Sequence, residues 1–224
     1  MKNNKFIKRI ACSLVALGIS TLANSNSWAE NLKIGVVGPY TGEMSNYGIS
    51  AKNGATLAIK HINAAGGVLG TELEVVSQDD ACDSAKAAQV AEEMIAENVI
   101  AVIGHICNNS TEAALPSYLG ASIPVISAAS TNPNLTNDGK YPNFFRTISH
   151  DASQALLQVE FAVKALGIKK AAVIFDQGNY GKEMAGLVRD GLEQNGVKVL
   201  VFEPIESGAE NYSELIGKLR KAKV

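Results

Sequence analysis

Residues 100–111 place a short apolar run directly before a cluster of small polar side chains. The run ends at Gly104, a pattern typical of a buried parallel strand. Ser110 and Thr111 follow as candidate N-caps of a helix that runs to Gly120. In an open parallel sheet, a helix N-terminus at the carboxyl end of a strand faces the usual ligand crevice and favours an anion. We therefore expect a binding site for a small acid here.

The sequence offers little support for an enzyme. No side chain in residues 100–111 is a nucleophile with a base beside it, and the chain contains no G-x-S-x-G motif. His61, His105 and His150 show no metal-ligand spacing, so we predict neither a metal nor a cofactor. His105 follows a buried strand and is expected to pack in the core. A secreted hydrolase stays an alternative only because residues far apart in the sequence can meet in the fold.

Charge and composition argue against two further classes of partner. The formal net charge is −2 and aromatic residues make up 6% of the chain. Neither a nucleic acid nor an anionic membrane surface is expected to bind such a chain.

The amino terminus has the features of a secretory signal peptide. Basic residues precede an apolar run at 10–22, and a small-x-small site at 27–29 predicts cleavage before Glu30. A membrane anchor is the alternative, but the run is short for one. Cys12 would leave with the signal. Cys82 and Cys107 then remain as a disulfide or as two free thiols, and export favours the disulfide.

Strands and helices alternate from residue 32 onward, which predicts an α/β fold with a parallel sheet and right-handed crossovers. We expect strands at 32–37, 72–77, 100–104, 124–126, 170–175 and 197–202, and helices at 47–65, 84–98, 110–120, 151–166, 180–195 and 212–221.

Residues 131–142, rich in Asn and Pro, are expected to form a surface loop, and the pattern restarts near residue 143. This organisation predicts a signal peptide at 1–29, a first lobe at 30–149 and a partial second lobe at 150–224, joined by a hinge. The second lobe has only two clear strands before Val224, and a sheet of two strands is too small to build a well-covered lobe. We therefore expect the second lobe to be truncated.

Five motifs occur in a fixed order, at residues 38–42, 62–70, 79–83, 103–107 and 146–147. Together they resemble the amino-terminal lobe of type I periplasmic binding proteins, most of all the leucine/isoleucine/valine-binding proteins of ABC transporters. The resemblance extends from residue 32 to residue 224. It implies a two-lobed fold in which each lobe is a parallel sheet flanked by helices, and it implies that Cys82 and Cys107 match the paired cysteines of the first lobe.

The resemblance also implies a set of ligand-binding residues. They are Tyr47 and Tyr180 as tyrosines lining the cleft, Asn108 in place of a serine that contacts the ligand carboxylate, Ala129 and Thr131 as the strand-end pair that binds an amino-acid head group, and Asp151 at the crossover. Ser110, at the expected helix N-terminus, would add donors for the carboxylate. The acidic residue that holds the ligand ammonium in this family lies beyond Val224.

Each of these assignments has a structural alternative. In the alternative, Tyr47 and Tyr180 would simply pack at the starts of their helices. Asp151 would be only the N-cap of its helix, and Thr131 would only stabilise a turn. Asp79 and Asp80 are expected to form a solvated turn rather than to contact a ligand.

The resemblance implies a periplasmic receptor, not an enzyme. It would capture a branched-chain or related amino acid, close over it like a Venus flytrap, and deliver it to the membrane permease of an ABC transporter. We expect a monomer. The alternative is a ligand-binding sensor domain for amides or other small solutes.

Overall fold

The computed structural model describes residues 31–224. The predicted signal peptide at residues 1–29, with Cys12, lies outside the described residues. None of the described helices combines the length and the apolar composition needed to cross a membrane.

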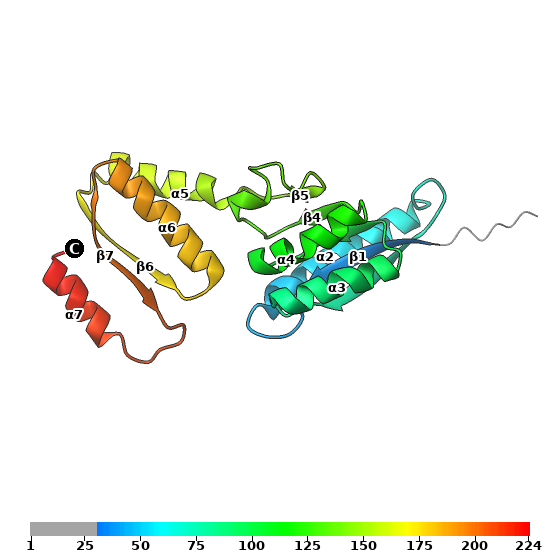
Figure 1. Ribbon diagram of the computed structural model, residues 1–224, viewed down its shortest axis with the longest axis horizontal. Coiled ribbons are helices and arrows are strands. Elements are labelled where there is room, and N and C mark those ends of the chain that lie inside the picture. Colours follow the sequence, from blue (N-terminus) through cyan, green and yellow to red (C-terminus); the bar gives the residue numbers. More distant parts are fainter. Residues whose placement is uncertain (1–30) are drawn as a thin grey trace, which may run out of the picture. The chain divides into compact units, whose positions relative to one another are not determined.

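The amino-terminal half is built on one parallel sheet of five strands with the order β2-β1-β3-β4-β5. Figure 1 labels β1, β4 and β5 of this sheet. The strands are β1 (Leu32–Gly38), β2 (Leu73–Asp79), β3 (Ala101–Ile103), β4 (Val125–Ser127) and β5 (Phe144–Arg146). Because β1 lies between β2 and β3, successive crossovers leave it in opposite directions. Such a reversal opens a crevice at the carboxyl ends of the strands.

Three helices connect these strands: α2 (Ser45–Ala64), α3 (Ser84–Ala96) and α4 (Asn108–Gly120). Helix α3 begins where the sequence predicts, because the Asp83 side chain accepts a hydrogen bond from the N–H of Lys86. Helix α4 begins earlier than predicted: its N-cap is Cys107, in extended conformation, and Ser110 and Thr111 both lie buried within the first turn. The predicted N-cap was therefore wrong.

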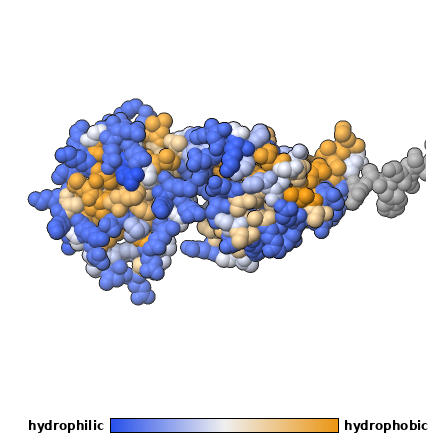
Figure 2. Space-filling model, viewed as in Figure 1, coloured by the Kyte–Doolittle hydropathy of each residue, from blue (hydrophilic) through white to orange (hydrophobic). Residues whose placement is uncertain are grey.

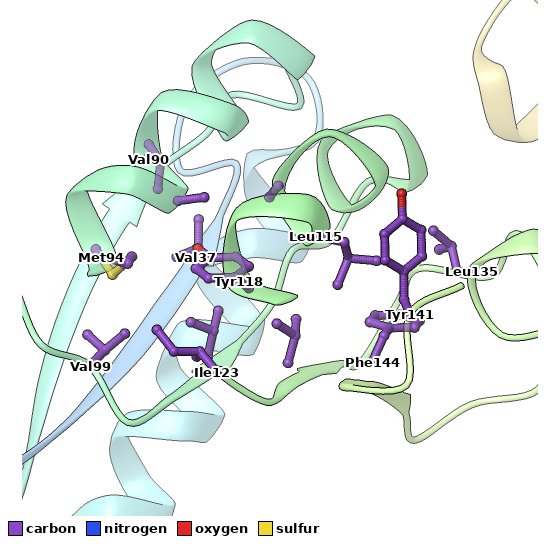
Figure 3. Close-up of a cluster of buried hydrophobic side chains, with 14 residues drawn as sticks. Val37, Val90, Met94, Val99, Leu115, Tyr118, Ile123, Leu135, Tyr141 and Phe144 are labelled. Atoms are coloured by element: carbon purple, nitrogen blue, oxygen red, sulfur yellow. The ribbon is translucent and has the colours of Figure 1, made fainter. Parts of the chain in front are cut away.

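The core of this half lies between the sheet and the packed pair α3 and α4 (Figure 3). Met94 and Tyr118 are its largest fully buried side chains, and they come from these two helices. Leu135 and Tyr141 also enter the core, so residues 131–142 are not simply a surface loop. These two apolar side chains anchor the segment, which includes a 3-10 turn at Pro133–Leu135.

Strand β5 is a feature that the sequence pattern did not predict. Phe144, Phe145 and Arg146 pair in parallel with β4, and only Phe144 is buried. A strand of three residues has too little periodicity to stand out, and it forms here because β4 offers a free edge.

A second, two-stranded parallel sheet follows, made of β6 (Lys170–Asp176) and β7 (Lys198–Ile205). Its helices are α5 (Asp151–Glu160), which continues into a π-helical turn (Phe161–Ala165), α6 (Asn179–Gln194) and α7 (Ser213–Ala222). A small cluster of Val159, Leu192 and Val197 forms its core. Figure 2 shows apolar residues gathered on the surface in the region of this sheet, where Leu200 and Ile216 are exposed.

The parallel sheets and alternating helices confirm the predicted α/β fold class. The division into lobes at residues 149 and 150 stays a prediction.

Candidate ligand-binding crevice

The crevice is formed by the segments that follow β1, β3 and β4. Gly104 makes the turn after β3 possible, because a Cβ at this position would collide with the carbonyl group of Val37 on the neighbouring strand. Gly104 also has a φ of 133°, a conformation that residues with a side chain rarely adopt. The chain then passes directly into helix α4, whose first residue is Asn108.

Asn108 ties the start of α4 to the segment after β4. Its Oδ1 accepts hydrogen bonds from the backbone N–H groups of Thr131, at 2.8 Å, and Asn132, at 3.1 Å. A backbone N–H can only donate, so these two contacts fix the amide orientation and turn Nδ2 the other way. There Nδ2 lies 3.5 Å from Oε2 of Glu183 on α6.

The segment after β4 is held by hydroxyl groups. Ser127 Oγ accepts hydrogen bonds from the backbone N–H groups of Ala129, at 3.2 Å, and Ser130, at 2.9 Å. The Ser127 and Ser130 hydroxyls both donate to the backbone carbonyl of His105, which joins this segment to the one after β3. Ala129 and Thr131 are thus placed on a fixed backbone.

The two hydroxyls expected at the helix N-terminus have different environments. Thr111 Oγ1 donates to the carbonyl of Cys107 at 3.0 Å, so its own helix uses it. Ser110 Oγ is fully buried and has no hydrogen-bond partner among the described residues.

An open hollow of about 350 Å³ lies between the start of α2 and the segment after β4. Its lining is mostly apolar and consists of Asn46, Tyr47, Ser50, Ala51, Ile106, Ala128 and Ala129. Two residues predicted to bind the ligand, Tyr47 and Ala129, meet here. Tyr47 is 62% exposed, so it does not pack into the core at the start of its helix.

Asp151, the first residue of α5, is a buried carboxylate that has the Thr131 hydroxyl beside it but no well-formed hydrogen bond. Neither of its oxygens has a well-formed hydrogen bond within the described chain, although its side chain is fully buried. Burial raises the pKa of the carboxyl above its ordinary 3.8, and the smaller opposing effects of Thr131, Arg146 and His150 do not offset it. The N-cap of α5 is His150, whose ring accepts from Ser153 N–H, so the alternative of Asp151 as N-cap was wrong.

Arg146 lies near Asp151 but its hydrogen bonds go elsewhere. The guanidinium donates to the carbonyls of Ser130 and Asn132, at 3.1 and 3.0 Å, and to the Thr136 hydroxyl at 2.7 Å. Asp151 is connected to the crevice through its backbone, since its N–H donates to the carbonyl of Thr131 at 2.9 Å.

Helix α6 contributes one predicted residue and one that sequence reasoning missed. Tyr180 is 47% exposed, and its hydroxyl accepts from Gln154 Nε2 at 3.4 Å. Glu183 accepts from Asn132 Nδ2 at 2.9 Å as well as from Asn108. Glu183 follows Tyr180 by three residues, so both lie on one face of the helix. From this spacing, Glu183 could have been predicted as a neighbour of Tyr180 in the site.

Glu183 is exposed, but partial desolvation of its carboxyl raises the pKa, and the charges of Asp151 and Glu112 raise it further, against the hydrogen bonds from Asn132 and Asn108. Two carboxyl groups of raised pKa, Asp151 and Glu183, thus contact the segment after β4. Together with Asn108, Thr131 and Asn132 they are called the polar end of the crevice.

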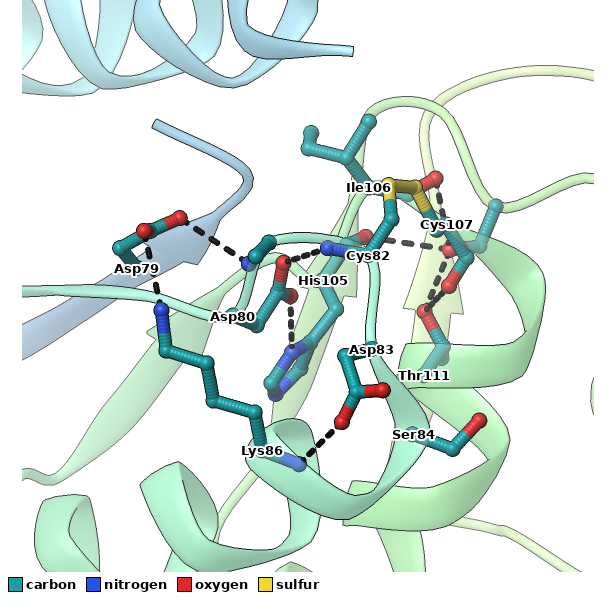
Figure 4. A network of polar contacts seen from close by, with 12 residues as sticks. Asp79, Asp80, Cys82, Asp83, Ser84, Lys86, His105, Ile106, Cys107 and Thr111 are labelled. Atoms are coloured by element: carbon teal, nitrogen blue, oxygen red, sulfur yellow. Dashed lines mark hydrogen bonds and ion pairs between the residues drawn. A yellow bond between two sulfur atoms is a disulfide. The ribbon is translucent and has the colours of Figure 1, made fainter. Parts of the chain in front are cut away.

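The paired aspartates at the end of β2, Asp79 and Asp80, do not form a solvated turn (Figure 4). Asp80 and His105 are fully buried, with Nδ1 of the histidine 2.7 Å from Asp80 Oδ2, which confirms that His105 packs in the core. Asp79 accepts from Tyr40 N–H at 2.7 Å, Thr41 Oγ1 at 2.6 Å and Lys86 Nζ at 2.9 Å. Neither aspartate is left free to meet a ligand.

Cys82 and Cys107 form a disulfide with Cα atoms 5.5 Å apart, as expected (Figure 4). The bond joins the segment after β2 to the N-cap of α4. Asn109 adds a hydrogen bond from Nδ2 to the Cys82 carbonyl at 2.8 Å. The first turn of α4, which carries Asn108, is therefore held from two sides. No cluster of possible metal ligands occurs within residues 31–224.

These features can be compared with known proteins. Residues 31–224 match the family described as periplasmic binding protein. The chain belongs to the periplasmic binding protein family. This confirms the family predicted from the motifs, and its known members with similar sequences are solute-binding proteins.

The similarity is substantial but partial in length. The chain is 37% identical, over 220 residues, to a leucine-, isoleucine-, valine-, threonine- and alanine-binding protein of Pseudomonas aeruginosa, covering 98% of this chain and 59% of that protein. It therefore spans less than two thirds of that relative.

Solved structures agree with the fold. A branched-chain amino acid transporter substrate-binding protein from Streptococcus pneumoniae, in complex with isoleucine, superposes with a TM-score of 0.75 and 28% identity, over 85% of this chain and 54% of that one. A solute-binding protein from R. palustris in complex with benzoate gives a TM-score of 0.74 at 21% identity, over 87% of this chain and 53% of that one. The second likeness concerns the fold alone.

Proposed function

We propose that this chain is the solute-binding part of an ABC transporter, exported by its signal peptide and acting in the periplasm. It captures a branched-chain amino acid or a related amino compound and delivers it to a membrane permease. The named functions of similar proteins support this proposal. It rests most directly on Asp151, a buried carboxylate that has no good partner of its own.

An unpartnered buried carboxylate is costly unless a cation approaches it. The amino group of a ligand supplies such a cation, and charge-assisted hydrogen bonds of this kind are about twice as strong as neutral ones. The family resemblance implied an acidic partner of the ligand beyond Val224, whereas Asp151 offers a carboxylate among the described residues. Thr131 stands beside Asp151 and adds a hydroxyl to the same end of the crevice.

The apolar part of the ligand is proposed to occupy the hollow beside Tyr47. A lining of alanine, isoleucine and tyrosine side chains suits an aliphatic group and offers it no ionic partner. Tyr180 would cover the ligand from the second lobe, so that binding favours a closed arrangement that the permease recognises. We propose that the receptor acts as a monomer.

The test is isothermal titration of the full-length gene product with leucine, isoleucine, valine and other amino compounds. We expect saturable binding of at least one of them, and a loss of about tenfold or more in affinity for Thr131→Ala, which removes the hydroxyl near Asp151. Thr56→Ala is the matched control, because the Thr56 hydroxyl bonds only to Lys52 within its own exposed helix turn. Equal affinities of the two variants would refute the role of Thr131.

A further inference from the structure

The polar end of the crevice is unusual in what it leaves available to a ligand. Two successive backbone N–H groups, those of Thr131 and Asn132, lie in the segment after β4, and free N–H groups there would suit a carboxylate. Instead both are taken by Oδ1 of Asn108, at 2.8 and 3.1 Å. The side chain of Asn108 thus puts its own carbonyl oxygen where an oxygen of the ligand could have been bound.

The other end of the Asn108 side-chain amide is its NH₂ group, which faces the carboxylate of Glu183. Asn108 Nδ2 lies 3.5 Å from Glu183 Oε2, at the long limit of a hydrogen bond, whereas Asn132 Nδ2 holds the same oxygen at 2.9 Å. A donor from α4 and an acceptor from α6 therefore stand side by side with only a weak contact between them.

A primary carboxamide is the complement of this pair. Its carbonyl oxygen accepts from Asn108, and its NH₂ donates to Glu183. A carboxylate has two acceptor oxygens, so one of them would meet the Glu183 carboxylate. The fully buried Asp151 lies close enough to act on the charge of Glu183, as does Glu112 on α4, and both add to the negative potential.

We infer that Asn108 and Glu183 select a ligand whose carboxyl end is a neutral amide, held between the two side chains, while its amino group meets Asp151. This inference rests on the proposed function and names the chemical class of its solute: an aliphatic amino amide in preference to the free amino acid.

Three matched ligands separate charge from hydrogen bonding in isothermal titration of the full-length gene product at neutral pH. They are leucine, leucine methyl ester and leucinamide, which share one side chain and an amino group. We expect leucinamide to bind about tenfold or more tighter than leucine, and also tighter than the ester, which has the neutral carbonyl but no NH₂ to donate to Glu183.

Variants of the two selecting residues test the geometry. Asn108→Asp keeps the oxygen that ties Thr131 and Asn132 but removes the NH₂ that donates to the ligand carbonyl, so leucinamide and the ester are both expected to bind about tenfold or more weakly while the fold is kept. Asn108→Ser frees the two backbone N–H groups, and the preference should shift toward leucine by about tenfold or more. Glu183→Gln, which can both donate and accept, should reduce the preference for leucinamide over leucine.

Glu112→Gln is the control for Glu183→Gln. It removes a nearby exposed charge but no hydrogen bond to Asn108 or Asn132, so it should change the preference much less. Equal effects of the two variants, or tighter binding of leucine than of leucinamide by the unaltered protein, would overturn the selection by amide while leaving the proposed receptor function in place. Failure of the folded protein to bind any of the three ligands, and also isoleucine, valine and the other amino compounds, would overturn both.

Discussion

Replacing Asp151 by Asn tests whether this buried carboxylate, which has no well-formed hydrogen bond, serves ligand binding. The side chain is fully buried, and neither oxygen has a well-formed hydrogen bond among the described residues. An unpaired buried polar group costs about 1–3 kcal/mol, and a charged group more. Asparagine keeps the shape and a polar group but removes the charge, so we expect the ligand-free protein to gain about 1 kcal/mol of unfolding free energy at neutral pH.

The pH dependence gives this prediction a second signature. Because burial raises the pKa of Asp151 in the folded chain, the folded state binds the proton more tightly than the unfolded state does. The contribution of this group to stability therefore falls as pH rises from its ordinary pKa of 3.8 through the raised value. The difference in stability between Asp151→Asn and the unaltered protein should grow over that window and level off above it.

Urea unfolding followed by circular dichroism at a series of pH values measures this difference. Asp190→Asn, at an exposed aspartate on α6, is the control and should follow the unaltered protein throughout. Ligand binding should change in the opposite sense, with affinity for an amino compound falling by about tenfold or more in Asp151→Asn. A variant that is less stable, binds as well, or shows the same pH profile as the unaltered protein would refute the reasoning.

Two further predictions concern the scaffold and the hollow. Replacing Cys82 and Cys107 by Ser should lower the unfolding free energy by about 3 kcal/mol in the chain-entropy model, measured by urea unfolding without reductant; an unchanged transition midpoint would contradict this. Tyr47→Ala should reduce ligand affinity by about tenfold and leave the melting temperature nearly unchanged, because the side chain is 62% exposed in the ligand-free protein. A drop in melting temperature with unaltered affinity would instead favour a packing role.

The sequence allowed the repeating part of the fold to be predicted, because apolar periodicity and glycine stops are local signals. The long elements α2, α3 and α6 were all expected close to where they lie. Strand β5 was missed because a three-residue strand is defined by its pairing with β4, which is a long-range contact. The start of α4 was misplaced because the Thr111 hydroxyl bonds within the helix instead of capping it.

Some of the predicted site residues come together in the structure, whereas their role in binding stays a prediction. Tyr47 and Ala129 do meet at one hollow, and Asp151 lies near Thr131. Sequence reasoning treated Asn108 as a donor to a ligand carboxylate, but it could not show that its oxygen would be taken by two backbone N–H groups. Which end of an amide faces the ligand depends on segments far apart in the chain, and no local pattern contains that information.

The central claim is that this chain captures an amino compound in the crevice between β1, β3 and β4. Isothermal titration of the full-length gene product with branched-chain amino acids and their amides tests it most directly. We predict saturable binding of at least one of these compounds, weakened in Thr131→Ala and in Asp151→Asn. A protein that is folded by circular dichroism and binds none of them would contradict the account.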